Sequence, residues 1–273
     1  MESIRGVHIT SKLNPNYRQW LKLLYARGRK RERLFLIEGM RELSRALQAN
    51  ICVRAFIFQQ SALASQNEKI QKHFGHCLGR ENCFVLADSL FKKLSVRENS
   101  DGVMGVAEVW ESPLESFQIC DDGLYLLVEH LEKPGNLGAM MRSAEATNVD
   151  GLLIADPCVD IFNPNVIRTS QGAVFGLNIV WDTAERIHDF LDGKNINILA
   201  MTPDADLLYW DVDMTQPCVV CIGNEAHGLT PLWLEKATKV AVPMFGRSAD
   251  SLNAGIVGSL CLYEARRQRR CKS

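Results

Sequence analysis

Residues 218–229 read CVVCIGNEAHGL, in which an unbroken apolar run passes directly into a Gly-Asn-Glu turn. An apolar run without alternating polar residues is typical of a β-strand that is covered on both faces. Strands of that kind occur almost only in parallel sheets flanked by helices. The stretch therefore predicts an α/β fold, with Gly223 at the point where the strand ends.

Similar runs recur between helical patterns in the second half of the chain. They are LYLLVEH at 124–130, GLLIAD at 151–156, LNIVW at 177–181, INILAMT at 196–202 and KVAVPM at 239–244. We expect them to form a mostly parallel sheet with helices on both faces. Ligands of such sheets bind beyond the carboxyl ends of the strands. The loops expected at that edge follow Val128, Thr202, Ile222 and Pro243.

The first part of the chain has a different pattern. Basic or polar helical stretches at 16–27 and 39–49 alternate with the β-rich runs VRAFIF at 53–58 and GVMGVAEVW at 102–110. This alternation indicates a smaller α/β domain. Pro113 and the Asp-Asp-Gly turn at 121–123 mark the expected boundary. We predict an N-terminal domain of residues 1–112 and a C-terminal domain of residues 122–273.

The composition indicates a soluble protein with a large core. The chain has 273 residues, of which 47% are hydrophobic, and this is enough to bury a substantial core. It contains no apolar run of about 18 residues, and its start, MESIRGVHITSK, has no apolar signal-peptide core. We therefore expect no membrane insertion and a cytoplasmic location.

Cysteine usage indicates a reducing environment. The nine cysteines are irregularly spaced and odd in number, which suits free, buried thiols better than a disulfide framework. Cys218 and Cys221 form a C-x-x-C pair, but they lie in a predicted buried strand and no second pair of ligands follows. We expect no metal site.

The overall charge of −1 conceals a basic segment. Residues 1–54 contain twelve Lys and Arg, from Arg5 to Arg54, against four Glu. Basic residues beside Tyr17, Trp20 and Tyr25 suit nucleic-acid binding with base stacking, whereas a solvated face is the alternative interpretation. A second basic cluster, ARRQRRCK at 265–272, fits either a nucleic-acid contact or the cationic end of a soluble helix.

The loop after LYLLVEH carries polar residues at a predicted helix start. It reads EKPGNLGAMMRSAEA, with Asn136 near the start of the helix and Arg142 six positions later. Helix starts bind anions, so Asn136 could cap the helix or contact a ligand, and Arg142 could reach a phosphate or a ribose hydroxyl. An ordinary N-cap followed by a surface arginine is the alternative.

Two further loops combine small and polar residues. Gly223 permits a close approach of a ligand to the backbone, and Glu225 places a charge at the sheet edge. His227 is either a general base or a surface residue. Ser251 and Asn253 stand at the entry of a helix that begins with small residues, which permit close packing.

Together these three segments resemble a known family. They contain N-x-G-x-x-x-R at 136–142, G-N-E-x-x-G-L at 223–229 and P-M-x-G…S-L-N at 243–253. In this order they are similar to the three signature motifs of SpoU-type (TrmH-like) RNA 2'-O-ribose methyltransferases. The resemblance covers roughly residues 124–268. The basic segment with LFLIEGMRELSRAL at 34–47 also resembles the small substrate-binding domain of many members.

The resemblance implies a deep trefoil knot in the C-terminal domain, a homodimer and S-adenosylmethionine as the cofactor. The implied cofactor-binding positions are Thr202, Ile222, Gly223, Val242, Met244 and Leu252. The implied catalytic set is Arg142, with Asn136, Glu225, Ser251 and Asn253 orienting Arg142, the ribose and the methionine end of the cofactor.

Two points qualify the chemistry. The resemblance implies that Arg142 acts as the 2'-hydroxyl loses its proton. The pKa of arginine lies above about 12, so we interpret its role as anchoring a phosphate and stabilising a developing alkoxide, with proton acceptance by Arg142 as the alternative. The family run usually continues S-L-N-V-S, whereas this chain has Ala254 and Gly255 after Asn253. If the serine of the family shapes the pocket, its absence here lowers activity or cofactor affinity.

The function implied is S-adenosylmethionine-dependent 2'-O-methylation of a ribose in RNA. A separate N-terminal domain favours ribosomal RNA over transfer RNA, which is the first alternative. A non-catalytic RNA-binding protein that retains the fold is the second. Methylation of a base nitrogen is disfavoured, because the related knotted families that modify bases lack this set of motifs.

Overall fold

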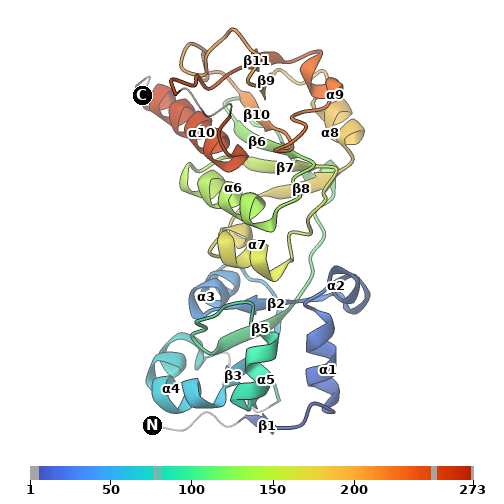
Figure 1. Ribbon diagram of the computed structural model, residues 1–273, viewed down its shortest axis with the longest axis vertical. Helices are drawn as coiled ribbons and strands as arrows, with labels where there is room; N and C mark the ends of the chain where they lie inside the picture. The colour runs from blue at the N-terminus through green and yellow to red at the C-terminus, as the bar shows by residue number, and fades with distance from the viewer. Residues whose placement is uncertain (1–5, 77–78, 80, 247–250, 272–273) are drawn as a thin grey trace. The chain divides into compact units, whose positions relative to one another are not determined.

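The computed structural model describes residues 6–76, 79, 81–246 and 251–271. The chain divides into two compact units (Figure 1). Unit 1 comprises Met1–Trp110 and Asp160–Gly176, and unit 2 comprises Glu111–Val159 and Leu177–Ser273. The polypeptide therefore leaves unit 2 once and returns to it.

Unit 2 is built on a six-stranded sheet in the order β11-β9-β10-β6-β7-β8, and the pairings described are all parallel. Its strands are β6 (Leu124–Glu129), β7 (Gly151–Ala155), β8 (Ile179–Asp182), β9 (Asn197–Met201), β10 (Cys218–Ile222) and β11 (Thr238–Val240). Its helices are η1 (Leu114–Ser116), α6 (Pro134–Ala146), α8 (Ala184–Leu191), α9 (Pro231–Leu234) and α10 (Ala254–Arg270). Each of the six apolar runs forms a strand, so the predicted sheet is confirmed.

Helices cover both faces of this sheet. Along β6, Tyr125 and Leu127 pack with the residues of α8 and α9 in one apolar cluster. Leu126, which points the opposite way, lies against Gly258 of α10. Because every residue of β10 is buried, this strand needs apolar side chains on both faces, which explains its unbroken pattern. The predicted α/β class is therefore confirmed, whereas the trefoil knot remains a prediction.

A buried carboxylate ties β6 to α9. Glu129, at the end of β6, is fully buried. It accepts hydrogen bonds from the Thr230 backbone N–H at 2.7 Å, from the Thr230 hydroxyl at 2.7 Å and from Trp233 Nε1 at 2.9 Å. A buried charge is tolerated when such partners satisfy it. The Glu129 side chain therefore fixes the segment that follows the Gly-Asn-Glu turn.

Unit 1 is built on a mixed five-stranded sheet in the order β1-β4-β3-β5-β2. Its strands are β1 (Val7–Ile9), β2 (Leu34–Glu38), β3 (Val53–Gln59), β4 (Cys83–Leu86) and β5 (Val103–Glu108). Its helices are α1 (Pro15–Lys22), α2 (Ala26–Glu32), α3 (Met40–Gln48), α4 (Gln60–Phe74), α5 (Asp88–Leu94), α7 (Pro164–Thr169) and η2 (Ala173–Phe175).

The predicted elements of this unit are mostly present. The β-rich runs form β3 and β5, and the helical stretch 39–49 forms α3. The stretch 16–27 is broken instead of continuous, since α1 ends at Lys22 and α2 begins at Ala26. The chain turns so sharply there that a Cβ on Gly28 would lie 1.9 Å from the Lys22 carbonyl oxygen.

Residues 160–176 pack within unit 1, although they fall inside the predicted C-terminal domain. Asp160 forms an ion pair of 2.6 Å with Arg29, whose side chain is buried. The ring of Phe162 lies 5.0 Å from that of Phe35 and 4.6 Å from that of Trp110. These contacts hold the segment on β2. The boundaries at residues 112 and 122 remain predictions.

Two further expectations concerned the state of the cysteines and membrane insertion. Eight of the nine cysteines fall within them, and all eight are free thiols. Among the helices of the described residues, none combines the length and the apolar character that crossing a membrane requires.

Candidate functional site

A cavity of about 480 Å³ opens in unit 2 at the carboxyl ends of β9, β10 and β11. Its walls come from Met201–Asp204 after β9, from Ile222–Leu229 after β10 and from Val242 and Met244 after β11. Small-molecule sites have volumes of about 300–1,000 Å³ and occupy this edge of an open α/β sheet. The cavity has the size and place of a ligand site.

The structure brings most of the predicted site residues to this cavity. All six predicted cofactor-binding residues line it, namely Thr202, Ile222, Gly223, Val242, Met244 and Leu252. Glu225 and Ser251, from the predicted catalytic set, also line it. Asn136, Arg142 and Asn253 are not among the lining residues.

The turn after β10 requires glycine at its first position. A Cβ on Gly223 would lie 2.2 Å from the backbone carbon of Gly228. Gly228 itself has a φ of +70°, and Asn224 and Gly228 exchange two backbone hydrogen bonds of 3.0 and 2.9 Å. The loop from Asn224 to Gly228 is thus closed on itself, directly over Gly223.

Asn224 is a structural residue of the site that the sequence analysis missed. Its amide nitrogen donates to the carbonyl of His130 at 2.9 Å, and its Oδ1 accepts from the backbone N–H groups of Ala226 and His227 at 2.8 and 3.2 Å. The side chain is buried and joins the loop after β6 to the loop after β10. Its place in the Gly-Asn-Glu turn was the available signal, because asparagine often bonds to the backbone two residues on.

Three polar side chains from different segments form a continuous chain beside the cavity. Asn136 Nδ2 donates to Glu225 Oε1, and Asn253 Nδ2 donates to Asn136 Oδ1 at 3.2 Å. Asn136 was expected to cap its helix or to contact a ligand, but α6 begins two residues earlier and its N-cap position is Lys133. Asn253 is the residue that caps, since its Oδ1 accepts from the Gly255 N–H at 2.9 Å.

Arg142 lies apart from these three hydrogen-bonded side chains. It is exposed on α6 and makes no hydrogen bond or ion pair with the described residues. Six residues of α-helix rotate its Cα by about 120° from Asn136, so the two side chains leave different faces. The structure therefore joins Asn136, Glu225 and Asn253, and leaves the guanidinium of Arg142 available for a ligand.

Ala254 and Gly255, which replace the usual Val-Ser of the family motif, lie at the start of α10. Ala254 and Gly255 are buried, and Ala254 lines the cavity. A Cβ on Gly255 would lie 3.1 Å from Asn253 Oδ1 and 3.8 Å from Ala139 Cβ. A larger residue would therefore press on the side chain that caps α10, and glycine at 255 leaves this cap undisturbed.

Burial favours the neutral thiol at the two cysteines of the C-x-x-C pair. Cys218 and Cys221 lie in β10, and burial raises the pKa of both thiols. One group of possible metal ligands occurs among the described residues, comprising Glu129, His130 and Asp156. Its buried member, Glu129, already accepts the three hydrogen bonds from Thr230 and Trp233.

The basic segment of unit 1 differs from the expected stacking surface. Tyr17 and Trp20 are buried in the core, and burial also raises the pKa of Tyr17. Only Tyr25, which is 72% exposed, remains accessible among the three aromatic residues named. The Arg29 side chain is buried and forms an ion pair with the half-buried Asp160, so it is structural, and Arg5 lies outside the described residues. Base stacking by Tyr17 and Trp20 is therefore excluded in this fold.

The C-terminal basic cluster has structural members as well. Arg266 donates to the carbonyls of Thr147 and Asn148 at the end of α6. Arg269 donates to the carbonyls of Met214 and Gln216, each at 2.9 Å. Both arginines bind α10 to neighbouring loops. Lys272 lies outside the described residues.

Comparisons with known proteins agree with this geometry. A sequence model described as the SpoU rRNA Methylase family matches residues 123–263, and one described as an MRM3-like substrate binding domain matches residues 14–105. A 23S rRNA (uridine(2479)-2'-O)-methyltransferase of Streptomyces viridochromogenes is 31% identical over 273 residues, covering 96% of this chain and 92% of that protein.

Solved structures with the same fold include two close matches. A crystal structure of an RNA 2'-O ribose methyltransferase has a TM-score of 0.86 and 38% identity, covering 97% of this chain and 100% of that one. The SpoU methyltransferase AviRb from Streptomyces viridochromogenes, in complex with the cofactor AdoMet, has a TM-score of 0.83 and 28% identity, covering 94% of this chain and 98% of that one.

Proposed function

Because this chain belongs to the SpoU rRNA methylase family, we propose that it transfers the methyl group of S-adenosylmethionine to a ribose 2'-hydroxyl of ribosomal RNA. The observation that carries the proposal is the cavity after β9, β10 and β11, which is lined by the six cofactor residues that the family resemblance implies. The relative from Streptomyces viridochromogenes acts, by its name, on a ribose of 23S rRNA.

The cavity fits S-adenosylmethionine chemically. Gly223 has no side chain, so a ligand can approach the backbone of the turn closely. Met201, Ile222, Leu229 and Val257 add apolar surface, while Glu225 and Asp204 add negative charge that suits a cationic ligand. Bound there, S-adenosylmethionine supplies a methyl group on a positively charged sulfur.

Different residues of the protein are assigned different roles in methyl transfer. A ribose 2'-hydroxyl is a weak nucleophile and must be held in place as it loses its proton. Arg142 has a free guanidinium, which we assign to anchoring the RNA phosphate and stabilising the developing negative charge on oxygen. Asn136, Glu225 and Asn253 form one hydrogen-bonded chain, which we assign to orienting the reacting groups.

The wider organisation is part of the same proposal. Residues 1–112 would bind RNA and residues 122–273 would carry out methyl transfer, in agreement with the two family matches. Ile256 and Tyr263, which are seven residues apart on α10, are exposed apolar side chains on one face and suit a homodimer contact. We place the protein in the cytoplasm.

The test combines cofactor binding with methyl transfer. Calorimetry should detect S-adenosylmethionine binding to the purified protein, and the protein should transfer a labelled methyl group to unmodified 23S ribosomal RNA transcribed in vitro. Replacing Arg142 by alanine should lower the transfer rate by about 100-fold or more, with the melting temperature and cofactor affinity unchanged. The Arg142→Lys variant, which keeps the charge but loses the planar guanidinium, should recover little of the rate.

The alternatives predict different results. Undetectable cofactor binding would support a non-catalytic RNA-binding protein. Transfer to transfer RNA but not to ribosomal RNA would change the substrate and leave the chemistry in place. Mapping of 2'-O-methyl positions in RNA from cells with and without the protein identifies the target nucleotide.

A further inference from the structure

A second cavity, of about 510 Å³, lies entirely within unit 1. It is lined by Arg41, Val96, Arg97, Glu98, Asn99 and Arg168. Arg41 comes from the first turn of α3, Arg97 from the loop after α5 and Arg168 from α7, so three distant segments each supply an arginine. None of these residues lines the cavity assigned to the cofactor.

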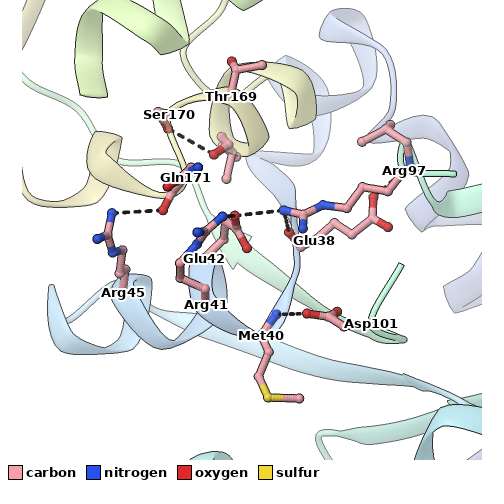
Figure 2. A network of polar contacts seen from close by, with 12 residues as sticks. Glu38, Met40, Arg41, Glu42, Arg45, Arg97, Asp101, Thr169, Ser170 and Gln171 are labelled. Carbon is pink, nitrogen blue, oxygen red and sulfur yellow. Dashed lines mark hydrogen bonds and ion pairs between the residues drawn. The ribbon is translucent and has the colours of Figure 1, made fainter. Parts of the chain in front are cut away.

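A buried carboxylate holds two of these arginines. Glu42, on α3, is 1% exposed, and its Oε1 forms ion pairs with Arg41 Nη2 at 3.1 Å and with Arg97 Nη2 at 2.9 Å. Figure 2 shows the two guanidinium groups converging on Glu42 from α3 and from the loop after α5. A buried carboxylate is retained only with such partners, so Glu42 fixes both arginines in place.

The Arg97 side chain is anchored a second time. Arg97 Nη2 also donates to the Glu38 carbonyl at 3.0 Å, and the Glu38 carboxylate accepts from the Val96 N–H at 2.8 Å and from the Ser95 hydroxyl. Arg97 Nε is buried and has no hydrogen-bond partner among the described residues. The contacts of Glu38 and Glu42 therefore hold the loop and the Arg97 guanidinium in place, and one buried donor of this guanidinium is left without a partner.

Glycine is required beside this pair. Gly39 has a φ of +114°, which disfavours other residues, and a Cβ there would lie 2.2 Å from Glu42 Oε2 and 2.9 Å from Arg97 Nη2. The turn between β2 and α3 thus leaves just enough room for the ion pair. The sequence segment EGMRE at 38–42 is built around the pair of Glu42 and Arg97.

The side chains of Arg41 and Arg168 are exposed and available to a ligand, whereas the Arg97 side chain is 20% exposed. The Arg41 side chain is 51% exposed, and Arg168 is exposed and makes no ion pair with the described residues. Arginine presents planar, fork-like donors that match the oxygens of a phosphate group. Prepositioned donors bind more tightly, because less side-chain freedom is lost on binding.

We propose that Arg41, Arg97 and Arg168 form a binding site for a backbone phosphate of the RNA substrate, with Glu42 as the residue that positions Arg41 and Arg97. The inference rests on the proposed RNA substrate, but it does not depend on methyl transfer. It places one specific RNA contact in unit 1.

The first test removes the ligand-facing charges. The double variant Arg41→Gln/Arg168→Gln should weaken binding of 23S ribosomal RNA transcribed in vitro by about tenfold or more, measured by filter binding at fixed salt. Its plot of log affinity against log salt should be less steep by about one, because one phosphate contact is lost. The control is Arg186→Gln in unit 2, which removes one positive charge from a side chain that is 55% exposed and also ion-paired.

The second test separates positioning from charge. Glu42→Gln makes the protein more positive, and charge alone would then tighten RNA binding. Positioning predicts the opposite, a weaker affinity in protein that melts cooperatively and retains cofactor binding. If Glu42→Gln does not fold, the RNA affinity and salt dependence of the double variant Arg41→Gln/Arg168→Gln test the site.

The possible results distinguish a failure of the proposed phosphate site from a failure of the proposed function. Absence of RNA binding by the unaltered protein would overturn the proposed function and this site together. Normal binding and methylation, with equal affinity and salt dependence in the double arginine variant and the Arg186→Gln control, would overturn the site alone. Tight binding of inorganic phosphate that does not compete with RNA would also overturn it, since the pocket would then hold a free anion.

Discussion

Asn136 is the central residue of the hydrogen-bonded chain of side chains beside the proposed cofactor cavity. Its amide donates to Glu225 and accepts from Asn253, so a single side chain joins α6, the turn after β10 and the start of α10. Replacing Asn136 by alanine should lower the methyl-transfer rate by about 100-fold, because the groups that orient the reaction would lose their common partner. Initial rates with labelled S-adenosylmethionine measure this effect.

The control for this variant is Asn178→Ala. Asn178 is also a polar residue of unit 2, but it is exposed and its amide contacts only the Asp150 carbonyl at 3.4 Å among the described residues. It should retain the full rate. Equal rates for Asn136→Ala and Asn178→Ala would show that the chain does not orient the reaction.

Cys261 gives a prediction about pH. It is buried in α10 beside Met201, and burial raises the pKa of its thiol from 9.0 to about 12. The neutral thiol is therefore favoured in the folded protein, and its contribution to stability is complete below about pH 9 and is lost as the pH rises toward 12. The difference in unfolding free energy between the unaltered protein and Cys261→Ala should shrink over this range, as measured by urea unfolding. A difference that stays constant to pH 11 would contradict the shift.

The turn after β10 is the element on which the proposed cofactor cavity depends. In Gly223→Ala, the new Cβ would collide with backbone atoms of Gly228, which cannot move without opening the loop. We expect unfolding free energy to fall by about 1–3 kcal/mol and cofactor affinity to be largely lost. Thermal unfolding and calorimetry measure the two effects.

Gly135→Ala is the matched glycine control. Gly135 lies in the first turn of α6, where a Cβ would meet nothing within 4 Å. Alanine favours helix, so this variant should be as stable as the unaltered protein or more stable by up to about 1 kcal/mol. A loss of cofactor binding in both variants would mean that the collision at Gly223 is not the cause.

The strands of unit 2 were predictable because a strand that is buried on both faces has an unbroken apolar sequence. Strands such as β10 need apolar residues at every position, and polar residues appear only where the strand ends. The rule for strand ends placed the loops after β9, β10 and β11 at the edge where the cavity lies. The individual site residues were assigned through the resemblance of the three motifs, since Asn136 and Arg142 lie in α6 and Asn253 caps α10.

Features that depend on tertiary packing or on exact helix starts could not be predicted from local sequence patterns. The burial of Tyr17 and Trp20 depends on packing against β4 and α5, so an aromatic residue beside arginines looks the same whether it stacks on a base or fills a core. The capping role of Asn253 in place of Asn136 depends on where each helix starts, which sequence fixes poorly. The packing of α7 on β2 joins segments more than 100 residues apart, which local patterns do not encode.

At the scale of the whole molecule, the proposed homodimer gives a prediction. Ile256 and Tyr263 are 50% and 57% exposed on α10, and their replacement by glutamate would place charge on this face. The double variant should sediment as a monomer in analytical ultracentrifugation, whereas the unaltered protein should sediment as a dimer. Leu13→Glu, at a 79% exposed position in unit 1, is the control and should remain dimeric. A monomeric unaltered protein would contradict the homodimer.

Residues 160–176 determine how this protein can be recombined with its relatives. The chain passes between the units at 110/111, 159/160 and 176/177, so no single crossover transfers unit 1 intact. A chimera joined only near residue 111 would pair Phe35 and Trp110 of one parent with Phe162 and Phe175 of the other. Unit 1 is thus encoded by two separate pieces of the gene, and a change in the aromatic rings of one piece calls for a matching change in the other.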